Sequence, residues 1–174
     1  MKRLLGPLFT ATLLTPTAVH AGTVFDKYFA GAEGGKTCYT RLYDEQHLKI
    51  HPRQRVTQIA LAFDIAKSGS GKPLDGHKFE VALGLRVKEA TELFLSPAYC
   101  STERSGVVCH VEGDGGTFRI GPGANDGLTI EVMGDGLRFE GENDAIEVGG
   151  KRSDDNRFSL TRIDPERCSI RLRR

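Results

Sequence analysis

The 174-residue sequence lacks tryptophan, lacks a marked excess of charge of either sign, and contains no apolar segment long enough to cross a membrane. A transmembrane helix needs about 20 consecutive apolar residues, and the apolar stretch at residues 4–14 is shorter than that. The 24 lysines and arginines nearly balance the 23 aspartates and glutamates. A nucleic-acid-binding domain would carry a clear basic excess. We therefore expect neither a membrane span nor a nucleic-acid partner.

The N-terminal segment, residues 1–21, is typical of a secretory signal. It begins with two basic residues, continues with the short apolar stretch, and ends with small residues at the cleavage spacing, Val19 and Ala21. Cleavage after Ala21 would leave residues 22–174 as a single mature domain. We expect that domain to be periplasmic or secreted.

Four cysteines in an exported chain predict two disulfides rather than a metal–thiolate site. The segment "CSTERSGVVC" has the pattern of two strand ends around a turn, which favours a Cys100–Cys109 pair. Cys38 and Cys168 would then join the beginning and the end of the domain. None of the spacings is C-x-x-C, so neither a thioredoxin-like redox site nor a zinc knuckle is expected.

Strict alternation of apolar and other residues predicts an all-β fold. Residues 56–65, "VTQIALAFDI", and residues 78–88, "KFEVALGLRVK", carry a large apolar side chain at every second position. Shorter alternating runs follow between glycine- and aspartate-rich turns, at 91–96, 107–112, 117–120, 128–132, 137–141, 145–148 and 158–163. This pattern predicts an antiparallel meander that forms a small barrel, with a two-sheet sandwich as the alternative.

Two short helical segments accompany the predicted strands. The first lies in residues 22–35, where the large apolar side chains follow a helical spacing: Val24, Phe25, Tyr28 and Phe29. A first strand is expected at 36–43. A second short helix is expected at 44–51, because Asp44 is a good N-cap and Pro52 follows its end.

A patch of small side chains is predicted on the outer face of the long hairpin. Closing the hairpin at residues 66–76 would set Ala60 opposite Ala82, with Ala62 and Gly84 beside them. Small side chains allow another segment to pack closely against them. We expect the aromatic N-terminal segment around Phe25 and Phe29 to lie on this patch.

The strongest candidate for chemistry lies on the second predicted helix. Asp44, His47 and His51 fall on one helical face, so a carboxylate and two imidazoles would be able to meet one zinc or copper ion. However, Leu48 occupies the position of the glutamate that a catalytic zinc motif requires. The alternative, which we prefer, is a solvated polar face with Asp44 as a cap and with Leu48 and Ile50 turned toward the barrel.

Other signatures are incomplete. Residues 66–73, "AKSGSGKP", resemble a phosphate-binding loop, but Pro73 replaces its serine or threonine and a strand follows. No G-x-S-x-G nucleophile motif occurs. The aspartates of the turns match neither an EF-hand nor a β-roll repeat, and hairpin geometry accounts for them without calcium.

The last six residues, "SIRLRR", are basic and alternate between apolar and arginine side chains. The pattern predicts a final strand with an exposed arginine face. Contact of these arginines with an anionic surface is the alternative.

The absence of tryptophan also separates the chain from two kinds of small exported barrel. It excludes the tryptophan motif of lipocalins and the ring-stacking tryptophans of avidins. A rigid barrel without a visible reactive constellation suggests a monomeric binding or accessory module of the cell envelope, without a cofactor, that recognises a protein or glycan partner. The alternatives are a metal-dependent hydrolase using Asp44, His47 and His51, and a purely structural envelope component.

Overall fold

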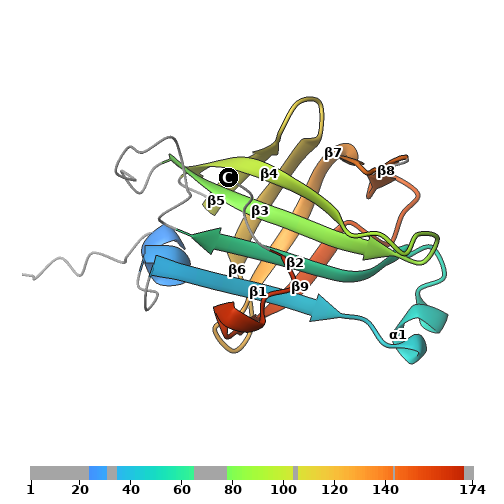
Figure 1. Ribbon diagram of the computed structural model, residues 1–174, viewed down its shortest axis with the longest axis horizontal. Coiled ribbons are helices and arrows are strands. Elements are labelled where there is room, and N and C mark those ends of the chain that lie inside the picture. Colours follow the sequence, from blue (N-terminus) through green and yellow to red (C-terminus); the bar gives the residue numbers. More distant parts are fainter. Residues whose placement is uncertain (1–23, 31–34, 65–77, 104–105, 143, 171–174) are drawn as a thin grey trace, which may run out of the picture.

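The computed structural model describes residues 24–30, 35–64, 78–103, 106–142 and 144–170 (Figure 1). The predicted signal segment, residues 1–21, and the loop at residues 66–73 lie outside these described residues. Within them, no helix is both long and apolar enough to cross a membrane.

Strands dominate the described residues. In chain order the elements are η1 (Asp26–Ala30), β1 (Lys36–Leu42), α1 (Glu45–Ile50), β2 (Val56–Asp64), β3 (Lys78–Val87), β4 (Phe94–Glu103), β5 (Gly106–Val111), β6 (Gly116–Pro122), β7 (Leu128–Glu140), β8 (Ala145–Val148), β9 (Arg157–Ile163) and η3 (Pro165–Arg167). The two predicted helical segments correspond to η1 and α1.

The predicted barrel is confirmed. All neighbouring strands are antiparallel, in the order β6-β5-β4-β3-β2-β1-β9-β7-β8, and an additional pairing of β6 with β7 closes the ring. Because β8 pairs only with β7, it is an extra strand on an eight-stranded barrel. The order departs from a simple meander at one point, where β9 lies between β1 and β7.

The segment "MGDG" at residues 133–136 does not form the turn that its composition predicts. Instead β7 continues through it as one strand, with positive φ angles at Gly134 (67°) and Gly136 (129°). The pairing with β6 jumps there, from Met133 opposite Thr117 to Leu137 opposite Gly116. The glycines therefore form a bulge rather than a hairpin. Beyond the bulge, the end of β7 pairs with β8.

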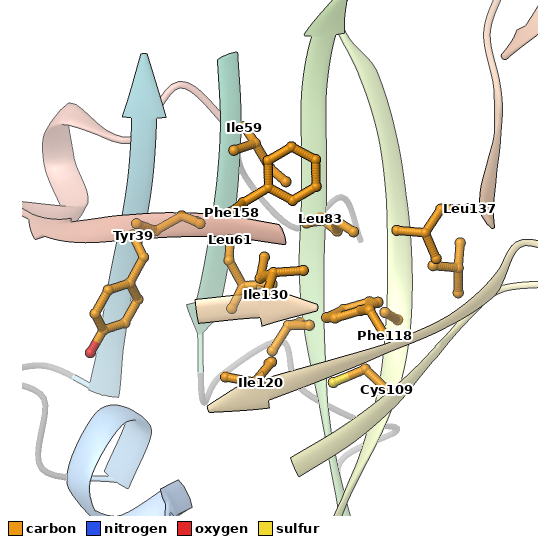
Figure 2. Close-up of a cluster of buried hydrophobic side chains, with 14 of the residues drawn as sticks. Tyr39, Ile59, Leu61, Leu83, Cys109, Phe118, Ile120, Ile130, Leu137 and Phe158 are labelled. Atoms are coloured by element: carbon orange, nitrogen blue, oxygen red, sulfur yellow. The ribbon is translucent and has the colours of Figure 1, made fainter. Parts of the chain in front are cut away.

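The barrel interior is filled by its own side chains. Figure 2 shows side chains from opposite walls meeting in the centre, including Leu61 and Leu83 from one side and Phe118 and Ile130 from the other. Each of these four side chains is completely buried. Small barrels of this size are usually packed in this way.

The aromatic N-terminal segment lies inside the barrel, so the predicted position on the small-residue face is wrong. The rings of Phe25 and Phe29 lie 4.8 and 5.0 Å from the ring of Phe79, and both also contact Phe63. Phe63 and Phe79 point inward near the end of β2 and the start of β3, and they need apolar cover at that end of the barrel. Packing four aromatic rings against one another buries more apolar surface, and so stabilises the fold more, than contact with a patch of alanines would.

The C-terminal segment covers the small-residue face instead. Ile170 forms a separate buried cluster with three alanines of β2 and β3, namely Ala60, Ala62 and Ala82. The hairpin register sets Ala62 opposite Ala82 and Ala60 opposite Gly84. The register thus differs by two residues from the predicted one.

Both predicted disulfides are present. Cys38 of β1 bonds Cys168, which follows η3, and Cys100 of β4 bonds Cys109 directly opposite on β5. All four cysteines are therefore paired. Stable disulfides of this kind indicate that the chain folds in an oxidising environment.

Candidate functional site

Of the three candidate metal ligands, His47 lies on α1, while Asp44 and His51 are its N-cap and C-cap, and their hydrogen bonds are those of a capped helix. Oδ1 of Asp44 accepts the backbone N–H of His47 at 2.7 Å. The imidazole rings of His47 and His51 stack, with centroids 4.4 Å apart. Among the residues described, no three histidine, cysteine, aspartate or glutamate side chains form a group that would hold a metal ion.

Gln54 fixes one of these imidazoles. Its amide nitrogen donates to the carbonyl of Val56 at 2.9 Å, and its oxygen faces Nε2 of His47 at 3.0 Å. The oxygen can only accept, so Nε2 carries the proton and donates.

The prediction that Ile50 turns toward the barrel is wrong, since it is 72% exposed, whereas Leu48 is half-buried. Side chains two residues apart on a helix point to nearly opposite sides, so α1 cannot turn both Leu48 and Ile50 toward the barrel.

A buried aspartate next to this helix fixes the chain instead of presenting a reactive group. The carboxylate of Asp155 accepts the backbone N–H of Arg55 at 2.7 Å and that of Val56 at 3.2 Å. Burial raises the pKa of Asp155, and these hydrogen bonds partly offset the effect. Asp155 therefore joins the start of β2 to the loop before β9.

Two further turn aspartates are engaged in ion pairs. Asp154 binds Arg53 at 2.7 Å, and Asp126 lies 3.8 Å from Nζ of Lys27 on η1. Like Asp155, they connect segments that are distant in the sequence.

A groove on the outer surface combines acidic and apolar side chains. It consists of two hollows of about 730 and 430 Å³, which share Leu95 and Glu140. The larger hollow is lined by Leu95, Ser96, Pro97, Glu112, Gly113, Asp114, Gly115, Arg138 and Glu140. The smaller one is lined by Glu92, Leu93, Leu95, Glu140, Gly141 and Glu142.

Three parts of the barrel build this groove. The first part of β4 supplies the apolar floor, where Leu95 and Pro97 alternate with inward-facing, buried Phe94 and Ala98. The segment just before β4, the β5–β6 turn, and the end of β7 with the turn that follows it supply the acidic walls. Because the bulge continues β7 beyond the region paired with β6, the end of that strand reaches β4.

The groove carries a strong negative charge. Its lining contains five carboxylates, those of Glu92, Glu112, Asp114, Glu140 and Glu142. They face a single guanidinium, that of Arg138, which binds Glu140 at 3.0 Å. At neutral pH the lining therefore has a net charge of −4, five negative charges against one positive.

The groove is suited to binding rather than to bond-breaking chemistry. Its lining contains no histidine or cysteine, and its one hydroxyl, that of Ser96, lies 3.4 Å from the neighbouring carbonyl of Pro97. Carboxylates beside an apolar floor attract a ligand that carries both cationic and apolar groups.

Sequence analysis did not find this groove. Its carboxylates belong to segments about 20 to 30 residues apart, around residues 92, 113 and 141. Each segment has the composition of an ordinary turn, and only the closure of the barrel brings the three together.

No protein family, curated protein or solved structure matches this chain.

Proposed function

We propose that the protein is an exported, non-enzymatic binding module that holds a basic segment of a protein partner in its outer groove, in the periplasm or outside the cell. The observation that carries this proposal is the lining of the groove, where five carboxylates and one arginine surround a leucine- and proline-rich floor. Negative potential concentrated in a concave surface raises the local concentration of cations and speeds their association.

The packed interior supports an external site. Inward-facing side chains such as Leu61, Leu83 and Phe118 are completely buried against one another. The aromatic rings of η1 fill one end of the same core. A ligand inside the barrel would have to displace these side chains, whereas the groove on the outer surface is open.

The groove favours a protein over a glycan. Protein surfaces often bind sugar rings by stacking them on aromatic side chains, and no residue of the groove lining is aromatic. Arginine, by contrast, pairs with carboxylates through two parallel hydrogen bonds. The stem of an arginine side chain can also cover apolar surface, such as the floor formed by Leu93, Leu95 and Pro97.

Fluorescence anisotropy with two labelled peptides, RLRLR and ELELE, tests the proposal. The mature chain should bind RLRLR in preference to ELELE. Replacing two exposed groove carboxylates, Glu112→Gln with Asp114→Asn, should weaken RLRLR binding about tenfold at low salt when the chain ends at Ile170, so that the basic residues 171–174 do not compete with the peptide. This loss corresponds to about 0.7 kcal/mol for each charge.

A matched double variant removes two exposed carboxylates outside the groove, Glu103→Gln with Glu131→Gln. Made in the same chain that ends at Ile170, it should bind RLRLR as tightly as that chain without substitutions. Equal binding of both peptides, or equal losses in both double variants, would contradict the proposed function.

A further inference from the structure

The described end of the chain crosses the outer face of the barrel toward the groove. Cys168 is bonded to Cys38 of β1, and Gln58 of β2 donates to Oγ of Ser169 at 3.4 Å. Ile170 then packs beside Gly84 of β3. Three consecutive residues thus advance strand by strand from β1 to β3, in the direction of β4.

The predicted final strand begins at Ser169, but Ser169 and Ile170 run across the strands of the barrel and do not form a strand themselves. The prediction is therefore wrong for these two residues. The remaining residues, 171–174, lie outside the described residues. Their sequence is Arg-Leu-Arg-Arg, which adds three positive charges directly after Ile170.

Ile170 fixes the point from which this segment leaves the barrel surface. It is only 2% exposed, and its cluster includes Leu93 and Leu95. Both leucines also line the acidic groove. Ile170, the last described residue, therefore lies beside the apolar floor of the groove.

We propose that residues 171–174 occupy the acidic groove of their own chain until a partner displaces them. Four extended residues reach about 13–14 Å, which spans two to three neighbouring strands. Arg171, Arg173 and Arg174 would meet the carboxylates, and Leu172 would lie on the apolar floor. The inference rests on the proposed function of the groove as a site for basic segments.

An attached segment competes strongly even when its intrinsic affinity is weak. A short tether gives an effective concentration on the order of millimolar, so a segment with an intrinsic Kd near 100 µM would weaken a competing ligand about tenfold. A partner would thus have to bind the groove tightly enough to displace the C-terminal segment.

The test compares RLRLR binding by three proteins: the mature chain, a chain that ends at Ile170, and a full-length variant with Arg171→Gln, Arg173→Gln and Arg174→Gln. All three keep Ile170 and both disulfides, so circular dichroism should show the same fold. The two altered chains should bind RLRLR about tenfold more tightly than the mature chain at low salt. The difference should vanish near 1 M salt, where exposed charges are screened within about 3 Å.

The outcomes separate the two proposals. Equal, measurable affinity in all three proteins would overturn the occupancy by residues 171–174 and leave the groove as a binding site. Failure of the chain ending at Ile170 to bind RLRLR would overturn both. A dimer that disappears when residues 171–174 are removed would overturn occupancy within one chain, because it would place them in the groove of a second copy.

Discussion

At the scale of single residues, Gly84 determines how closely the C-terminal segment can approach the barrel. A Cβ atom at this position would lie 2.5 Å from Cγ2 of Ile170 and 3.3 Å from Cδ1 of Leu95. The alternating pattern of β3 predicts the outward face of Gly84 correctly. It does not reveal what covers that face, because Ile170 is distant in the sequence and belongs to no regular element.

Gly84→Ala should destabilise the protein by about 1–3 kcal/mol, the usual cost of inserting a methyl group into a packed site. In an Ile170→Ala background the same substitution should cost much less, because the clashing side chain is gone. Urea unfolding of the four proteins in this double-mutant cycle measures the difference. The same cost in both backgrounds would place Ile170 elsewhere.

Tyr43 should make stability depend on alkaline pH. Burial raises its pKa from 10.0 to about 12, with a smaller contribution from Asp155 and an opposing one from Arg41. Between these pH values the folded chain binds more protons than the unfolded chain, so the free energy of unfolding should fall as pH rises. The free energy of unfolding of Tyr43→Phe should fall less over this pH range, as measured by urea titrations at successive pH values. Parallel curves for the two proteins would show that Tyr43 is not buried in this way.

At the scale of elements, alternation predicts most strands, and glycine-rich segments are harder to interpret. Positive φ at a glycine serves a hairpin turn and a bulge equally well. The sequence of residues 133–136 therefore predicts a turn, although these residues form the bulge that continues β7 toward β8. The helical spacing in residues 22–35 correctly predicts a short helix, which the structure shows at residues 24–30, but this spacing does not show whether the aromatic face lies inside or outside a barrel.

The position of η1 inside the barrel predicts a large effect of Phe29→Ala. The ring is 1% exposed and contacts the rings of Phe63 and Phe79, so its removal should cost about 3–5 kcal/mol. Lys27→Ala, on the exposed side of the same element, should change stability by less than about 0.5 kcal/mol. Chemical denaturation of the two variants measures their free energies of unfolding. Similar, small effects would mean that η1 does not belong to the core.

At the scale of the whole molecule, the two disulfides constrain the unfolded chain to different degrees. Cys38–Cys168 spans 130 residues, whereas Cys100–Cys109 spans 9. The sequence predicts both pairs, because only one short cysteine spacing fits a hairpin. The groove was not predictable, because the closed barrel assembles it from several turns and the register of the closure is not visible in any one of them.

Removing the long disulfide, with Cys38→Ala and Cys168→Ala, should destabilise the protein more than Cys100→Ala with Cys109→Ala. The loop-entropy relation gives about 5 kcal/mol for the longer loop and about 2.6 kcal/mol for the shorter one. Urea unfolding of the two double variants shows which of them loses more free energy of unfolding. A larger loss for the Cys100–Cys109 pair would show that strain or packing, and not loop length, dominates.

The most direct test of the external binding site is to map the contact of the RLRLR peptide by NMR. The ¹⁵N-labelled chain ending at Ile170 is titrated with the peptide, and backbone amide shifts are followed. The largest changes should occur in the groove, at Leu95, at residues 112–115 and at residues 138–142. Changes centred on inward-facing residues such as Leu61 and Leu83, with the groove unaffected, would contradict an external site.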